Sequence, residues 1–136
     1  MSDLATQAVQ QAVMTLLQND STLGAQINGV FDHVPDKTSF PYIVLSETES
    51  RDWSTTTRAG QEHRMTLSVY SRYGGKKQVQ QITERVYALL HEVTVSITGD
   101  SCVLCRFQLQ EITLLNDGRT YQGDSVFLLR TQADLI

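Results

Sequence analysis

The stretch from Phe40 to Ser71 reads FPYIVLSETESRDWSTTTRAGQEHRMTLSVYS, and it decides the fold. Residues 40–46 and 62–71 have the β-branched and aromatic content of strands. In the second segment Met65, Leu67 and Val69 alternate with polar residues, which predicts a sheet with one buried and one solvated face. The two segments flank a polar connection of about 15 residues, 47–61. A connection of this length is uncommon in a small domain and is usually functional.

The two arms of this connection can pair as a hairpin. Each arm has about seven residues, so at a rise of about 3.3 Å per residue the hairpin would project roughly 20 Å beyond the sheet. A hairpin of that length is marginally stable alone and gains from packing on another subunit or partner. The connection therefore points to assembly.

The spacing of apolar residues predicts helices over residues 3–18 and 76–92. Further strands are expected at 29–32, 102–115 and 125–131, with an extra short strand near residue 95. This order predicts an α+β fold: a largely antiparallel sheet with two amphipathic helices packed on one face and a long β-hairpin extension. At 136 residues the chain is long enough for a single core, so residues 1–136 are expected to form one domain.

The composition limits the class of partner. The chain has 11 basic and 15 acidic side chains and a net charge of −4, a balance unlike that of proteins whose main affinity is for the phosphate backbone. No run of about 18 apolar residues is present, so no membrane contact is expected. The N-terminal residues lack the pattern of a signal peptide, and two cysteines make no disulfide framework. A reducing, cytoplasmic origin follows.

Each motif that suggests chemistry lacks a necessary part. Cys102 and Cys105 have Cys-x-x-Cys spacing, but on a strand their side chains would point to opposite faces, with Cys105 in the core and Cys102 near the surface. The turn Gly74-Gly75-Lys76-Lys77 precedes a helix, yet it lacks the full phosphate-loop pattern. His33, His63 and His91 form no metal-binding motif. We therefore expect no catalytic residue, no cofactor and no metal, and hence no enzyme.

The polar connection holds the candidate site residues. One face of an extended segment would carry Glu47, Glu49 and Arg51. The two carboxylates could serve as an acid–base pair, or the three residues could form a charged strip that faces solvent or a partner. The strip is favoured, because a raised carboxyl pKa requires burial. Trp53 lies between arginines, as an interface anchor does, although it can instead fold back onto the sheet. The candidate subunit or partner interface is Glu47, Glu49, Arg51, Trp53 and Arg58.

Several segments, in their order and spacing, resemble the phage-type tail completion or tail terminator proteins of long-tailed phages, prophages and gene transfer agents. The resemblance covers nearly the whole chain and is carried by 30–35, 40–45, Trp53-Ser54, 58–60, 63–71, 89–91, Arg106-Phe107 and 117–120. It implies a homo-oligomer, typically a hexameric ring, that ends the tail tube and joins it to the head-side connector or stopper protein. It also implies a lumen through which DNA passes without specific binding. Such a protein would be made in the bacterial cytoplasm and reside in the virion tail or neck.

Two other classes of function remain open at this level. The Gly74-Gly75-Lys76-Lys77 turn could hold a phosphate in an enzyme. Alternatively, the chain could be a small monomeric α+β module that binds phosphate, nucleic acid or a peptide, although the acidic balance speaks against nucleic acid. Lysine-dependent nucleotide binding would favour the former, and salt-dependent binding of DNA or RNA the latter.

Overall fold

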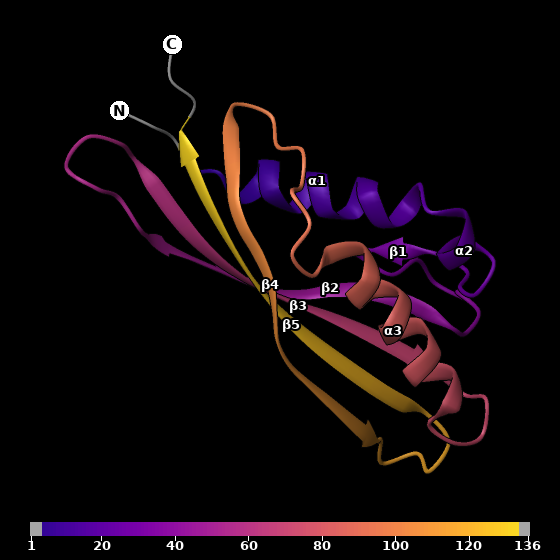
Figure 1. Ribbon diagram of the computed structural model, residues 1–136. Coiled ribbons are helices and arrows are strands. Elements are labelled where there is room, and N and C mark those ends of the chain that lie inside the picture. Colours follow the sequence, from indigo (N-terminus) through magenta and orange to yellow (C-terminus); the bar gives the residue numbers. More distant parts are fainter. Residues whose placement is uncertain (1–3, 134–136) are drawn as a thin grey trace.

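The computed structural model describes residues 4–133, which form one five-stranded sheet with helices on one of its faces (Figure 1). The strand order is β1-β2-β3-β5-β4, and all neighbours are antiparallel except the parallel pair β1 and β2. The α+β fold class is therefore confirmed. The elements are α1 (Thr6–Gln18), α2 (Ser21–Gly24), β1 (Val30–Phe31), β2 (Tyr42–Asp52), β3 (Gly60–Ser71), α3 (Lys77–Leu90), β4 (Asp100–Leu114) and β5 (Tyr121–Ala133).

Within the described residues, α1 and α3 cover one face of the sheet and no helix lies on the other (Figure 1). On β3, His63, Met65, Leu67 and Val69 are buried on the covered face, which confirms the alternation seen in the sequence. Phe127 of β5 is fully buried beside them. Burying an aromatic or aliphatic side chain of this size contributes about 1.5–3 kcal/mol relative to exposure. We call the helix-free side of the sheet the open face.

The segment around residue 95 differs from the expectation. No strand forms there in the described chain, and the only pairing is an isolated bridge between Ile97 and Asp100. Val95 and Ile97 are nevertheless buried and belong to the core. The apolar residues that suggested a strand therefore serve as an apolar connection between α3 and β4.

A further short helix, α2, begins where the first long helix was expected simply to stop. Asp20 is its N-cap, and its Oδ2 accepts a hydrogen bond of 2.8 Å from the backbone N–H of Leu23. The same carboxylate receives two hydrogen bonds from Arg85 of α3, of 2.9 and 2.6 Å. These contacts lower the pKa of Asp20 to about 2, chiefly through the hydrogen bond from Arg85. Asp20 thus ties the N-terminal helices to α3.

The polar connection forms the expected hairpin. Strand β2 continues to Asp52 and β3 begins at Gly60, so residues 53–59 alone lie outside the two strands. The hairpin projects away from α1 and α3 (Figure 1). Its β3 arm also pairs with β5, where Gly60 lies opposite Gln132. The hairpin is thus supported by a third strand and is more firmly held than an isolated ribbon.

The two cysteines do not diverge as the sequence spacing predicted. Cys102 lies opposite Thr131 and Cys105 opposite Leu129, and both partners are buried on the covered face of β5. Directly opposed residues point to the same face, so both sulfurs lie on the core side. The cause is a β-bulge between Cys102 and Leu104, because one extra residue inverts the alternation. Both cysteines are free, and burial raises the pKa of the Cys105 thiol to about 12.

Candidate assembly interface

Glu47, Glu49 and Arg51 share the open face of β2, as expected. Their partners across the ladder are Thr66, Arg64 and Glu62 of β3. Glu49 and Arg51 form an exposed ion pair, and this guanidinium lowers the pKa of the Glu49 carboxyl. A general acid at neutral pH would need the opposite shift. These residues therefore form a charged strip on the surface.

Trp53 and Arg58 hold the end of the hairpin against β5. The Trp53 side chain is half-buried, and the guanidinium carbon of Arg130 lies 4.9 Å from its ring centroid. Arg130 also donates a hydrogen bond of 2.9 Å to Glu62. The Nε of Arg58 donates to the backbone oxygen of Ala133 at 2.9 Å. The structure thus brings the candidate residues together along one projecting hairpin, with the Trp53 ring oriented by its own chain.

A buried polar chain beneath the hairpin was not recognised from the sequence. His63 has no exposed surface; its Nδ1 lies 2.8 Å from the Ser50 hydroxyl and its Nε2 lies 3.2 Å from the Thr131 hydroxyl. Ser50 in turn bonds to Thr6 at the start of α1, at 2.7 Å. Burial lowers the pKa of His63, so the imidazole is neutral in this position. The position of His63 two residues before Met65 is the sequence signal that could have placed it on the core face.

The Gly74-Gly75-Lys76-Lys77 segment is a turn between β3 and α3. Gly74 and Gly75 have φ angles of 95° and 116°, which residues with a side chain rarely adopt. Lys76 is the N-cap residue of α3, and its side chain makes no capping bond. Within residues 4–133 no cluster of three or more metal-ligating side chains is found. These features describe a glycine turn that leads into α3.

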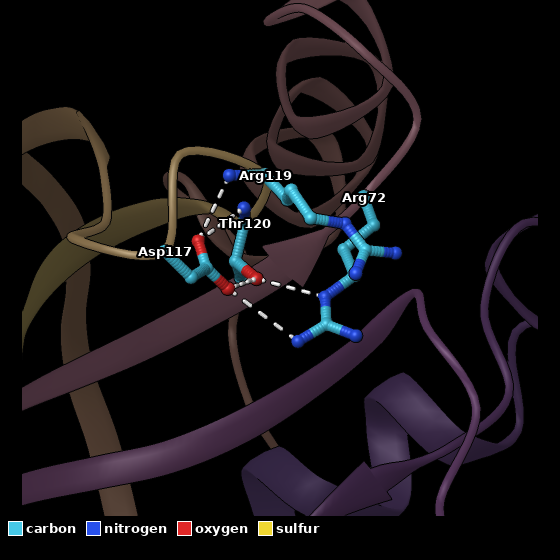
Figure 2. Close-up of polar contacts among 4 residues, drawn as sticks. All are labelled: Arg72, Asp117, Arg119 and Thr120. Atoms are coloured by element: carbon cyan, nitrogen blue, oxygen red, sulfur yellow. Dashed lines mark hydrogen bonds and ion pairs between the residues drawn. The ribbon is translucent and has the colours of Figure 1, made fainter.

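At the end of the sheet opposite the hairpin tip, Asp117 organises the turn between β4 and β5 (Figure 2). Its Oδ1 accepts from the backbone N–H groups of Arg119 and Thr120, both at 2.9 Å, and its Oδ2 accepts from the Thr120 hydroxyl at 2.6 Å. These bonds hold the pKa of Asp117 well below its usual range. Gly118 supplies the left-handed conformation of the turn, with a φ of 70°.

Arg72 connects this turn to the other strand ends. Its Nη2 lies 3.4 Å from Asp117 and its Nε donates to Thr120 at 2.9 Å (Figure 2). Its guanidinium also stacks over Phe40, 4.3 Å from the ring centroid. The start of β2, the end of β3 and the turn before β5 are thereby held together. The resemblance rests in part on Phe40 and on residues 117–120, and the structure gives them this structural role.

The described residues 4–133 form an α+β fold with a projecting hairpin. No helix among them is long and apolar enough to cross a membrane. Residues 11–132 match the family described as "Tail completion protein gp17". The chain belongs to this family.

A curated relative and a solved structure agree with this assignment. The chain is 25% identical over 122 residues to "Tail completion protein gp17" of Bacillus phage SPP1, covering 88% of this chain and 89% of that protein. It also matches a chain of "Virion of native gene transfer agent (GTA) particle" with a TM-score of 0.89 and 24% identity, over 97% of this chain and 100% of the other. The protein is accordingly a structural component of a phage-type tail, and its place is in the phage-like particle.

Proposed function

We propose that this chain forms a closed, hexameric ring that ends the tail tube and joins it to the head-side connector. The interior of the ring is a lumen through which DNA passes without specific binding, and the protein has no catalytic activity. Family membership supports the place in the tail. A closed ring requires contacts between unlike surfaces of neighbouring copies, and the projecting hairpin supplies one such surface.

The observation that carries the proposal is the balance of charge on the open face. It carries the carboxylates Glu47, Glu49, Glu62, Glu111 and Asp124, interspersed with Arg51, Arg64, Arg106 and Arg130. A broad sheet surface of nearly cancelling charge attracts a polyanion weakly, because retention on phosphates requires clustered cations. Such a face is suited to the wall of a passage for DNA.

The proposal is tested by assembly in solution and on tubes. Sedimentation velocity of the purified protein should show a ring-sized species whose population rises with concentration. Electron microscopy of the protein mixed with tail tubes should show density at one end of each tube. A protein that stays monomeric at high concentration and does not bind tube ends would contradict the proposal.

DNA titration distinguishes the ring from the nucleic-acid-binding alternative. We expect weak binding that does not change when Lys76 and Lys77 are both replaced by alanine. Tight, salt-dependent binding that is lost in the Lys76→Ala/Lys77→Ala variant would favour the alternative.

A further inference from the structure

Strand β4 has a long free edge. On one side it pairs with β5; on the other, the backbone N–H of Glu92 donates to the Cys105 oxygen at 2.7 Å, and that of Phe107 donates to His91 at 3.1 Å. In the described chain no strand pairs with this side over residues 108–114. Leu109 and Leu114 there are 49% and 46% exposed. Soluble proteins normally protect an edge strand with charges, proline or shortness, and this segment has one charged residue, Glu111.

The opposite side of the sheet has a second free edge. Strand β1 pairs with β2 at Ile43 and Val44 alone, and a bulge follows between Leu45 and Glu47. Beyond the bulge, residues 47–52 pair with β3 on one side and with no other described strand on the other. Among residues 4–133 the sheet therefore has two unpaired edge segments, 47–52 on β2 and 108–114 on β4.

The directions of the two edges are compatible with pairing between copies. Because β2, β3, β5 and β4 alternate in direction, β4 runs antiparallel to β2. Rotation about an axis that runs along the strands preserves their directions, so it places β4 of one copy antiparallel to β2 of the next. This contact joins unlike surfaces and can close into a ring.

Peptide orientation restricts the register. We call a residue outward when its backbone N–H and C=O groups point away from the neighbouring strand of its own sheet. Phe107 is outward, because its N–H points away from β5 to His91. After the bulge between Phe107 and Leu109, the alternation of the ladder makes Gln110, Ile112 and Leu114 outward as well. The N–H of Trp53, the residue after β2, donates to Gly60 of β3, so Trp53 is not outward. Because backbone direction alternates along a strand, Thr48, Ser50 and Asp52 of β2 are outward. Outward residues must oppose outward residues for hydrogen bonds to form.

Charge selects one of the allowed registers. With Ile112 opposite Ser50, Glu111 lies opposite Arg51 and Leu109 lies beside Trp53. Moving the pairing by two residues in one direction would place Glu111 opposite Glu49, and two like charges in directly opposed positions are destabilising. Glu111 and Arg51 are both exposed on the open face, where Arg51 pairs with Glu49 of its own strand and Glu111 of the neighbour would be a second carboxylate partner.

We propose that β4 of one subunit pairs antiparallel with β2 of a second copy, with Ile112 opposite Ser50 and Glu111 opposite Arg51. The inference rests on the proposed ring and adds the surfaces that close it. The sheets of neighbouring subunits then form one continuous sheet, and the hairpin residues Arg51 and Trp53 contact the neighbour.

Charge reversal tests the pairing. Glu111→Arg or Arg51→Glu alone should raise the concentration for half-assembly about tenfold or more in sedimentation velocity. The double variant should assemble like the wild type. An equimolar mixture of the two single variants should also assemble. In a head-to-tail ring with an even number of subunits the two variants can alternate, and every interface then brings an arginine opposite a glutamate. Single variants that assemble as well as the wild type would overturn the pairing.

Directed crosslinking tests the register independently. Glu49 and Thr113 are exposed and directly opposed in this pairing, so the Glu49→Cys/Thr113→Cys variant should give covalent multimers on oxidation. The matched control is Glu49→Cys/Arg106→Cys, which places the second thiol on the same face of β4 but outside its free edge. Equal multimer yields from both variants would overturn the register. A wild type that never assembles would instead refute the ring itself, so the two failures are distinguishable.

Discussion

Gly123 of β5 and Val79 of α3 are in such close contact that a Cβ atom at Gly123 would lie 2.3 Å from Val79 Cγ1. Two non-bonded carbon atoms do not lie this close together, so one of them would have to be displaced. Gly123 therefore sets the distance at which α3 packs on the sheet, and through α3 the position of the helix layer that covers β3 and β5.

Replacing Gly123 by alanine should lower the free energy of unfolding by about 1–3 kcal/mol, because the added methyl group overpacks the contact with α3. Val79→Ala alone should also be destabilising, because it leaves a cavity at a fully buried position. The Gly123→Ala/Val79→Ala variant should lose less than the sum of the two single losses, since the opposing methyl group is gone. Gly24→Ala is the matched control: nothing lies within 4 Å of a Cβ there, so its effect should be small. Urea unfolding of the four variants measures the coupling, and additive losses would contradict it.

Stability should fall as the pH drops below about 6.5, because burial lowers the pKa of His63 from its ordinary value of 6.5. The unfolded chain then binds a proton that the folded chain does not, so the contribution of His63 is complete above pH 6.5 and is lost towards its folded pKa. The slope is at most about 1.4 kcal/mol per pH unit for one proton. Unfolding between pH 7.5 and 5 measures it.

The His63→Gln variant separates this effect from other titrations. Glutamine retains hydrogen-bonding capacity for Ser50 and Thr131 but does not titrate, so the slope between pH 7.5 and 5 should become shallower. His33→Gln, at an exposed position, is the matched control for the substitution. An unchanged slope in His63→Gln would mean that another group carries the pH dependence.

The sheet was predictable from the sequence because its signals are local. The alternation of Met65, Leu67 and Val69 and the positions of Glu47 and Glu49 on one face follow from the two-residue period of a strand. The orientation of Cys102 was not predictable, since a single bulge inverts the alternation and no residue type announces it.

The contacts between segments that are distant in the sequence were not predictable for a different reason. Trp53 meets Arg130, and Asp20 meets Arg85, only because strand order and helix packing bring distant segments together. No local pattern encodes the partner in such pairs. The free edges of β2 and β4 likewise follow from the strand order and could be recognised only in the folded sheet.

Replacing Asp117 by alanine should lower the thermal midpoint, because it removes the acceptor for three hydrogen bonds in the turn before β5. The Asp117→Asn variant should lose less, since its amide oxygen still accepts from backbone N–H groups. Asp36→Ala, at an exposed loop position, is the control. Hydrogen exchange should show faster exchange at Arg119 and Thr120 in the alanine variant. Unchanged exchange there would show that the turn does not depend on Asp117.

Replacing Trp53 by alanine should impair assembly far more than it impairs the folded subunit. The ring is half-buried, and its cation–π contact with Arg130 is worth about 0.5–1 kcal/mol at an exposed site, so the monomer should lose about 1 kcal/mol with that contact. An anchor residue in a subunit contact contributes more binding free energy, so the half-assembly concentration should rise by about tenfold or more.

Thr56→Ala, at the exposed tip of the same hairpin, is the control and should assemble normally. Sedimentation velocity and urea unfolding measure the two quantities separately. A Trp53→Ala subunit that unfolds would place the ring in the core, and one that assembles normally would remove Trp53 from the interface.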